Sequence, residues 1–392
     1  MFQRDEDSFM NIGQRLREMF GVQLPIVQAP MAGSSDAELA IAVSEAGGLG
    51  SLPCAMLTPD QVRTSFRNIV QRTSRPSRPI NLNFFCHRSP MPDAARERQW
   101  RERLAPYYEE FGISSSAELS SPKRMPFDDA MCDVVVELKP AVVSFHFGLP
   151  SKSLVERVRA TGARIMSSAT TVAEARWLES EGCDAVIAQG FEAGGHRGMF
   201  LATDAASQVG TLALVPQIVD AVKVPVIASG GIADARGIVA AFALGASAVQ
   251  IGTAYLRCPE SRASSVHKKA LETAQEDQTV ITNVITGRPA RGIVNRAIRE
   301  LGPINALAPE FPLAAEAMAP LRSRAESNGS GDFSPLWSGQ GAAMCREISA
   351  GALTKMLAEE AVRLMKHLGA ATTSYPATHK RSDESRAVAL AA

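Results

Sequence analysis

Short apolar segments alternate with helical segments through the first two-thirds of the chain, and this alternation constrains the fold more than any other feature. The apolar segments are hydrophobic at successive positions, as expected of strands with helices covering both faces of the sheet. Eight such strands with helices between them predict an α/β fold, a closed (β/α)8 TIM barrel. The predicted strands are Pro25–Gln28, Gly48–Ser51, Ile80–Asn83, Ala141–Phe145, Arg164–Ser167, Ala185–Ala188, Pro225–Ala228 and Ala248–Ile251. The predicted helices include Asp36–Ala46, Thr58–Val70, Lys152–Ala160, Val172–Glu181, Leu212–Val222 and Asp234–Leu244.

The chain divides into four predicted parts. Residues 1–20 form an N-terminal extension, and residues 21–256 form the barrel core. Within the core, residues 86–140 are longer than one crossover and predict an inserted helical excursion with a loop. Residues 257–369 carry helices and turn-rich stretches, and we expect them to pack on the barrel and cap its mouth. From residue 370 to 392 the composition turns to small and polar residues, which predicts a disordered tail.

Charge and aromatic content argue against a nucleic-acid partner. The 392 residues contain 41 Lys+Arg and 41 Asp+Glu, so the formal net charge is zero. Such a chain lacks the positive field that non-specific nucleic-acid binding requires, and an aromatic content of 6% does not favour a base-stacking surface. We therefore expect a protein that acts on a small molecule and not on a nucleic acid.

Cysteine spacing and the apolar segments bear on metals, membranes and compartment. The six cysteines form no CxxC pair and no close Cys/His cluster, so we expect neither a metal site nor a disulfide framework. The uncharged stretch Gly237–Leu256 breaks into a helix and a strand, which favours a buried core over a membrane span. The acidic N-terminus around Asp5 has no apolar signal segment. A cytoplasmic protein with no membrane partner is expected.

In a barrel of this kind the chemistry lies beyond the carboxyl ends of the strands. After the first strand come Ala29, Pro30 and Met31, a small-residue turn through which backbone could approach a flat ligand. An ordinary strand-to-helix turn is an equal alternative. At the end of the third strand, the Asn83 amide offers a donor and an acceptor, although Asn is also a frequent turn former.

The loop after the sixth strand carries the strongest local signal in the chain. Between Gln189 and Gly198 four glycines surround His196, a pattern that brings backbone close to a ligand and presents an imidazole to it. Within this loop Gly194 and Gly195 are candidate cofactor contacts. His146, at the end of the fourth strand, and Arg197 are candidate substrate contacts. A structural hydrogen-bonding role is the alternative for either histidine.

The loops after the seventh and eighth strands resemble a phosphate site. Glycines there free backbone N–H groups at helix N-termini, where the dipole favours an anion. Close helix–strand packing is the alternative use of these glycines. No GxxxxGK[ST] motif and no strand-linked GxGxxG motif is present in the sequence. The candidate residues are Ser229, Gly230 and Gly231 in one loop and Gln250, Ile251, Gly252 and Thr253 in the other.

Further side chains could reach the same loops. The guanidinium groups of Arg197, Arg288 and Arg291 could meet either a substrate carboxylate or the carbonyls of the barrel itself. Trp337 and Tyr255 could wall the site, although packing elsewhere is the more usual role of such aromatic side chains.

Six motifs together resemble the nitronate monooxygenases, formerly called 2-nitropropane dioxygenases. The His-containing motif is fairly specific, whereas the glycine pairs are shared with many FMN barrels. The resemblance runs from about Pro25 to Gln340 and covers most of the chain. The motifs are Gln28-Ala-Pro-Met-Ala, Gly47-Gly-Leu-Gly, the Asn83 strand end, Gln189-Gly-x-Glu-Ala-Gly-Gly-His-Arg-Gly198, Ala228-Ser-Gly-Gly-Ile and Gln250-Ile-Gly-Thr.

The resemblance implies an FMN-dependent enzyme that uses O2 to oxidise a small alkyl nitronate, or a nitroalkane, to a carbonyl compound and nitrite. It implies that Gly231 and the segment 250–253 hold the flavin phosphate and that Asn83, Gln189 and Gly194 contact the flavin. His196 would be the base for a neutral nitroalkane, or would anchor the nitro group of a nitronate. The protein would be a monomer or a homodimer.

Other readings of the same loops remain open. An FMN-dependent NAD(P)H:quinone reductase or enoyl-thioester reductase of similar fold is the first alternative. A non-redox barrel, such as an isomerase or lyase, could use these loops for a substrate phosphate. A non-catalytic flavin-binding protein has no positive support in the sequence.

Overall fold

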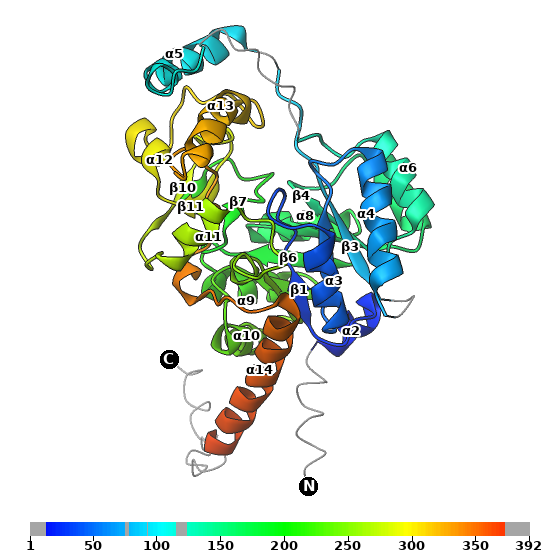
Figure 1. Cartoon of the computed structure of the whole chain (residues 1–392). Helices are drawn as coiled ribbons and strands as arrows, with labels where there is room; N and C mark the ends of the chain where they lie inside the picture. Colours follow the sequence, from blue (N-terminus) through cyan, green and yellow to red (C-terminus); the bar gives the residue numbers. More distant parts are fainter. Residues whose placement is uncertain (1–12, 75–77, 92, 115–123, 373–392) are drawn as a thin grey trace, which may run out of the picture.

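The chain folds around eight parallel strands, shown in Figure 1. The computed structural model describes residues 13–74, 78–91, 93–114 and 124–372. The strands follow one another in the order β1-β9-β8-β6-β5-β4-β3-β2, and a parallel bridge between Val27 and Leu49 closes the ring. The predicted (β/α)8 barrel is therefore confirmed. The strands are β1 (Ile26–Gln28), β2 (Gly50–Pro53), β3 (Ile80–Phe85), β4 (Val142–His146), β5 (Arg164–Ala169), β6 (Ala185–Gln189), β8 (Val226–Ser229) and β9 (Ala248–Ile251).

Helices follow the strands and cover the outside of the barrel. Several begin at a side chain that accepts a hydrogen bond from the first turn, including Asp36, Asp128, Thr171 and Asp234. Thr58 and Gln61 form a reciprocal capping box at another helix start. The helices are α3 (Ala37–Glu45), α4 (Pro59–Arg72), α6 (Asp129–Leu138), α7 (Lys152–Ala160), α8 (Val172–Ser180), α9 (Thr211–Ala221), α10 (Ala235–Ala243) and α14 (Ala350–Thr372).

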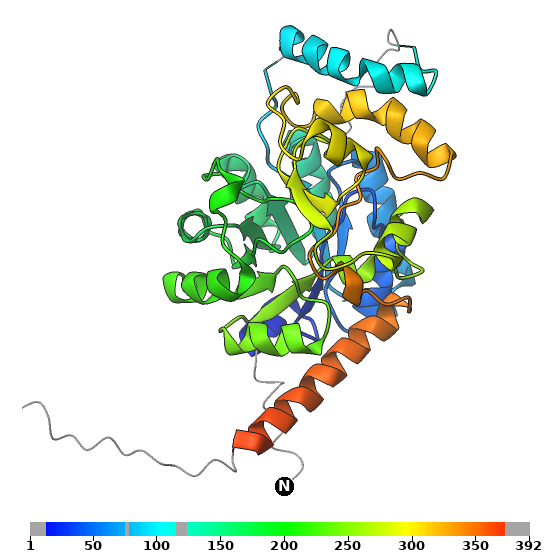
Figure 2. The same ribbon diagram turned by 90° about the vertical axis from the view of Figure 1, so that its left-hand side faces the viewer.

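Two helices from the ends of the described chain complete the barrel. The long helix α14 packs against α3 and α10 and then extends beyond the barrel, as Figures 1 and 2 show. At the amino ends of the strands, α2 (Gln14–Phe20) inserts Leu16 and Phe20 among Val142, Ala185 and Ala248. The barrel is thus covered at its amino end, and a site can open only at its carboxyl end. Most of the predicted tail, residues 373–392, lies outside the described residues.

A cap lies over the carboxyl ends of the strands. Helix α5 (Ala94–Glu110), from the predicted excursion, packs on α13 (Ala314–Ser327) above the barrel in Figure 2. Trp100, Leu104 and Leu321 belong to a second hydrophobic core there. The cap also contains α11 (Ser265–Glu272), α12 (Arg296–Leu301) and an antiparallel sheet of β10 (Thr279–Thr282), β11 (Ala290–Ile293) and β7 (Gly195–His196). Strand β7 belongs to the glycine-rich loop, so the cap holds the predicted histidine.

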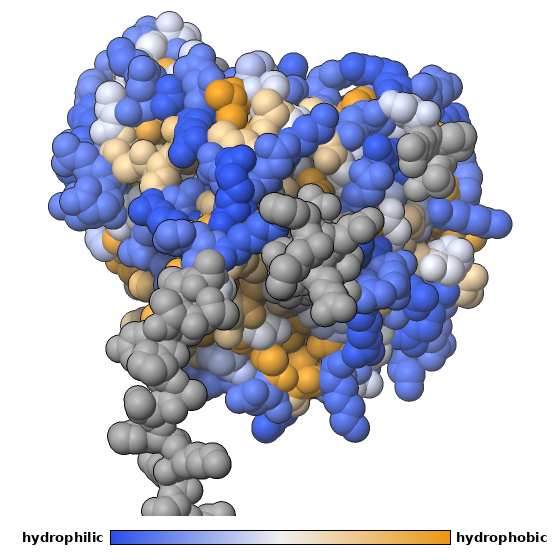
Figure 3. All heavy atoms as spheres, turned by 90° about the horizontal axis from the view of Figure 1, so that it is seen from below, coloured by the Kyte–Doolittle hydropathy of each residue, from blue (hydrophilic) through white to orange (hydrophobic). Residues whose placement is uncertain are grey.

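The described residues were compared with the requirements of a membrane span, a metal site and a disulfide. Within the described ranges, no helix combines the length and apolar character needed to cross a bilayer. The same residues contain no group of three His, Cys, Asp or Glu side chains placed to hold a metal ion. All six cysteines are free thiols. Seen from below in Figure 3, the surface is largely hydrophilic and surrounds smaller groups of hydrophobic residues.

Candidate active site

A pocket opens at the carboxyl ends of the strands, beneath the cap. Its space between atoms is about 1260 Å³ with the open mouth included, enough for a cofactor together with a small ligand. Strands β3, β4, β5, β6, β8 and β9 and the turn after β1 all contribute to its wall, and Trp337 and Gly339 approach from the cap side. The predicted residues that line it are Ala29, Pro30, Met31, Asn83, His146, Gln189, Gly194, Gly195, His196, Ser229, Gly230, Gly231, Gln250, Gly252 and Thr253.

The glycine-rich loop is held against the cap by close backbone contacts. A Cβ atom on Gly194 would lie 2.5 Å from the Gly339 nitrogen, so only glycine lets these two segments pass each other. Immediately afterwards the chain pairs with β11, with His196 opposite Ala290. The loop therefore enters the pocket between the barrel and the cap, with His196 fixed in a strand.

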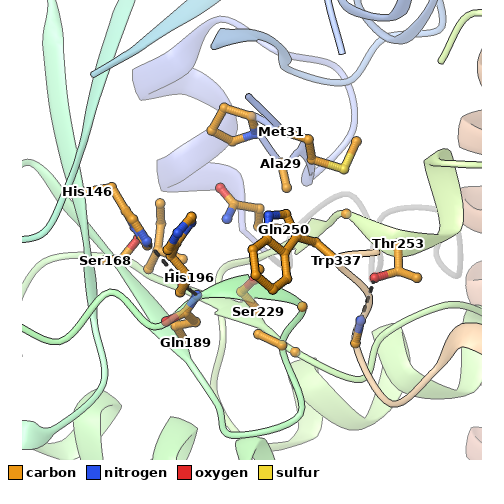
Figure 4. A pocket seen from close by; sticks show the side chains of 18 of the residues that line it. Ala29, Met31, His146, Ser168, Gln189, His196, Ser229, Gln250, Thr253 and Trp337 are labelled. Atoms are coloured by element: carbon orange, nitrogen blue, oxygen red, sulfur yellow. Dashed lines mark hydrogen bonds between the residues drawn. The ribbon is translucent and has the colours of Figure 1, made fainter. Parts of the chain in front are cut away.

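Two side chains hold the backbone carbonyl of His196, as Figure 4 shows. Gln189 Nε2 donates to this oxygen at 3.0 Å and His146 Nε2 at 3.2 Å. Because a carbonyl only accepts, the His146 proton lies on Nε2, and Nδ1 accepts from Ser168 Oγ at 3.1 Å. The far end of the Gln189 amide accepts from the Gly198 N–H at 2.7 Å. The ends of β4, β5 and β6 thus position the loop together.

The His196 imidazole lies between aromatic rings. Its centroid is 5.1 Å from that of Phe311 and 5.5 Å from that of Trp337. Nε2 lies 2.9 Å from Thr286 Oγ1, an interaction that fixes the plane of the ring. The side chain is therefore oriented by the cap as well as by its own strand.

Both pocket histidines are neutral at ordinary pH. Burial lowers the pKa of His146 to about 3, although its hydrogen bond to the His196 carbonyl acts in the opposite direction. Burial also lowers the pKa of His196 well below its usual range, and the nearby charge of Arg124 adds to this effect. A neutral imidazole can accept a proton, but it contributes no positive charge to the binding of an anion.

The predicted substrate contact Arg197 lies outside the pocket lining and is fully buried. Its guanidinium donates to the carbonyls of Gly190 at 2.8 Å and Gln189 at 2.9 Å, and to Gln208 Oε1 at 2.5 Å. Arg291 similarly donates to the Phe191 carbonyl at 3.0 Å. These contacts match the alternative left open by the sequence, in which the arginines bind carbonyls of the barrel.

Of the other predicted residues, some line the pocket and some are buried away from it. Ile251 is buried among the helices and does not line the pocket, whereas its neighbours Gln250 and Gly252 do. Tyr255 is likewise buried, and its hydroxyl lies 2.8 Å from Thr354 Oγ1. Trp337, by contrast, lines the pocket.

The two glycine-containing loops meet at one end of the pocket. Ser229 and Gln250 are register partners on β8 and β9, so the residues after them share one edge of the barrel. Gly231 has a φ of +69°, a conformation that favours glycine, and Thr253 begins a short 3-10 helix. Gly339 donates to Thr253 Oγ1 at 3.0 Å. Small residues and a helix start together form a cradle of the kind that receives phosphate.

The pocket also contains a polar atom that lacks a protein partner. Gln250 Oε1 is buried, and no described residue donates a hydrogen bond to it. A buried acceptor without a donor is costly, so this atom is expected to meet a ligand. With the cradle beside it, a ligand that carries both a phosphate and a hydrogen-bond donor would fit this end of the pocket.

Three of the lining side chains that the sequence did not predict are Ser168, Phe85 and Arg124. Ser168 lies at the carboxyl end of β5, and the general rule about strand ends could have found it. Phe85 lies two residues beyond Asn83 on β3, and no polar pattern marks it. Arg124 lies in the excursion, where no strand or glycine motif indicates its position.

Comparisons with known proteins agree with these features. The family model described as Nitronate monooxygenase matches residues 13–360. The chain is similar to a nitronate monooxygenase of Pseudomonas aeruginosa, with 42% identity over 348 residues that cover 88% of this chain and 98% of the relative. It also resembles the solved nitroalkane oxidase of Streptomyces ansochromogenes, with a TM-score of 0.81 and 39% identity over 90% of this chain and 99% of the other. FabK from Thermotoga maritima matches with a TM-score of 0.69 and 30% identity, over 91% and 98% of the two chains.

Proposed function

Because the chain belongs to the nitronate monooxygenase family, we propose that it is an FMN-dependent enzyme that oxidises alkyl nitronates with O2 to a carbonyl compound and nitrite. Neutral nitroalkanes are proposed as further substrates. The observation that carries this proposal is the meeting of a phosphate-type cradle and an oriented, neutral His196 in one pocket.

The residues present fit FMN. The loops 229–231 and 250–253 would hold its phosphate, and the buried Gln250 Oε1 would gain a donor from the ligand. Asn83, Gln189 and Gly194, together with the turn 29–31, would contact the ring system. When bound, FMN supplies the acceptor for the substrate's electrons and passes them to O2.

His196 carries out the proton transfer in this proposal. Nε2 is engaged with Thr286 Oγ1, which leaves Nδ1 to meet the substrate. Its lowered pKa keeps the ring unprotonated, so it can accept the α-proton of a neutral nitroalkane. A nitronate has already lost that proton, and His196 would then orient it in the other tautomer, with Nδ1 donating to a nitro oxygen while Nε2 accepts from the Thr286 hydroxyl.

The visible spectrum of the purified protein tests the proposal. We expect flavin absorption that bleaches when a nitronate is added without oxygen, then recovers with nitrite release when oxygen is admitted. Flavin absorption unaffected by nitronate but bleached by NADH or NADPH would contradict the proposal and favour the reductase alternative. A protein that binds no FMN after reconstitution would contradict the cofactor assignment.

A further inference from the structure

One formally charged side chain lines the pocket. Among the described lining residues, Arg124 is the single Lys, Arg, Asp or Glu. The remaining polar groups are amides, hydroxyls and the two histidines, whose pKa values are lowered by burial. The described part of the wall therefore carries a net positive charge and no carboxylate, which favours an anion inside the pocket.

The backbone around Arg124 is attached to the end of β3. Phe127 donates from its N–H to the Phe85 carbonyl at 2.7 Å, and Pro126 forms a parallel bridge with Phe85. Met125 donates to the Ala55 carbonyl at 3.3 Å. These contacts extend the barrel edge by several residues. They bring Arg124 to the pocket although the sequence before it leaves the barrel.

No described residue gives the guanidinium of Arg124 a counter-ion at contact distance. Within the described part of the chain, no carboxylate lies within 4.0 Å of its nitrogens. Burial and the charge of Arg322 lower the pKa of Arg124, while the more distant Glu316 acts in the opposite direction. A partly buried cation without a partner is unfavourable for folding, so a ligand is the natural partner for this one.

Arg124 also acts on the histidines around it. Its charge contributes to the lowered pKa of His196, which shows that the two groups share one electrostatic environment. His87 is buried beside the Arg124 backbone, and burial lowers its pKa to about 4. Neither imidazole supplies positive charge at neutral pH, and Arg288 donates to the Met199 carbonyl beyond the lining.

We propose that Arg124 binds the anionic nitro group of a nitronate substrate and makes the enzyme select the anion over the neutral nitroalkane. This inference rests on the proposed function. A nitronate carries its charge over two oxygens in a plane, and a guanidinium presents paired N–H donors in a matching plane. In Figure 4, Thr253 in the proposed phosphate cradle lies across Trp337 from His196, so the cofactor phosphate and the nitro group would have separate sites.

Arg124→Met and Arg124→Lys test the selectivity with ethyl nitronate and nitroethane as paired substrates. For Arg124→Met we expect kcat/KM for the nitronate to fall roughly 10–100-fold, the usual effect of losing a hydrogen-bonded charge. The value for nitroethane should fall less, because its nitro group is neutral on binding and gains charge only as His196 removes the proton. Arg124→Lys should recover part of the loss. Equal losses for both substrates would overturn the proposal.

Arg322→Gln is the matched control, because it removes a nearby charge that lies outside the lining and pairs with Glu326. It should leave the ratio of the two kcat/KM values unchanged. If Arg322→Gln lowers this ratio as much as Arg124→Met does, the selectivity arises from the general positive field of the pocket and not from contact with Arg124. That result would overturn the assignment.

Propionate provides a binding test that needs no turnover, since its carboxylate has the shape and charge of a nitronate. Propionate should perturb the flavin spectrum of the wild-type holoenzyme, and Arg124→Met should raise its Kd at least tenfold. A wild-type enzyme inert to nitronates would contradict the proposed function, while Arg124-dependent propionate binding would still support the anion site. Propionate binding that is equal in both proteins would overturn it.

Thermal unfolding separates binding from a structural role. Without an anion, Arg124→Met should unfold at the same temperature as wild type or higher, because an unpaired buried charge has been removed. A clearly lower unfolding temperature would assign Arg124 to the packing of the cap and overturn the proposal.

Discussion

The ring of His146 donates from Nε2 to the backbone carbonyl of His196 across 3.2 Å, so one pocket histidine positions the other. His146 contributes no charge and does not need to touch the substrate for this role. Its Nδ1 is fixed by Ser168, which sets the direction in which Nε2 points. The arrangement links the ends of β4 and β5 to the strand that carries the proposed base.

Replacing His146 with Phe should impair positioning while preserving the shape of the pocket. The phenyl ring can occupy the space between Phe85 and Phe147 but cannot donate to the His196 carbonyl. Loss of one hydrogen bond is worth about 1 kcal/mol, so kcat for a neutral nitroalkane should fall about fivefold with little change in KM. Ser168→Ala is the matched variant and should have a smaller effect. An unchanged kcat in His146→Phe would contradict the positioning role.

Substitution of His196 by Gln should separate proton transfer from flavin binding. Turnover of a neutral nitroalkane should fall roughly 10²–10⁴-fold, the usual contribution of a general base. Flavin content should stay at the wild-type level, and turnover of the nitronate should fall less. The comparison is made by steady-state nitrite release with both substrates. A variant that oxidises nitroalkane at the wild-type rate would remove His196 from the base role.

The lowered pKa of His196 sets a direction for the pH profile. Because the ring remains unprotonated well below its ordinary pKa of about 6.5, nitroalkane kcat/KM should not decline between pH 8 and pH 6.5. Arg124→Met removes a charge that lowers this pKa, so the acid side of its profile should move to higher pH. A profile that is unmoved in the variant would contradict the coupling of these two residues.

Gly252→Ala tests the cradle without straining the fold. A Cβ atom there would lie 3.4 Å from Ala29 Cβ, an ordinary contact, yet it would project into the lining of the pocket. The unfolding free energy without FMN should change by less than about 0.5 kcal/mol, while FMN should bind more weakly. Gly351→Ala on α14 is the control and should retain FMN. Equal FMN affinity in both variants, measured by flavin fluorescence, would place the phosphate elsewhere.

The barrel could be predicted from the sequence because its signals are local. Each strand is an apolar segment bounded by turn residues, and helix α7 has the bounds that its pattern predicts, Lys152–Ala160. The cap could not be placed in the same way. Helix α5 packs on α13 from more than 200 residues earlier in the chain, and no local pattern encodes that contact. The packing of α14 on α3 depends on the same kind of distant contact.

The site follows the same division between local and distant signals. Strand-end residues such as Asn83 and Gln189 could be predicted because the fold gathers the carboxyl ends of its strands. Side chains alternate between the two faces of β9, so Gln250 faces the pocket and Ile251 faces the helices. This alternation explains why Ile251, although predicted as a cofactor contact, does not line the pocket. Arg124 reaches the pocket through contacts of its segment with Phe85 and Ala55, which no pattern in the excursion indicates.

The buried histidines predict a loss of stability in mild acid. His87 and His267 are 6% and 4% exposed, and burial lowers the pKa of each to about 4. An unfolded histidine has a pKa of about 6.5, so between pH 6.5 and pH 4 the unfolded chain binds more protons than the folded one. Each buried ring should therefore lower the unfolding free energy by up to about 1.4 kcal/mol per pH unit as pH falls through this window.

Urea unfolding at pH 7 and pH 5.5 measures this effect, and His267→Gln isolates one ring. His267 Nε2 donates a hydrogen bond to the Trp337 carbonyl at 3.1 Å, and a glutamine amide can make the same hydrogen bond. The variant should lose less stability than wild type between the two pH values. His367→Gln on α14 is the control, because that side chain is exposed to water in the folded state as well. If His267→Gln and wild type lose equal stability, protonation of this ring does not drive acid unfolding.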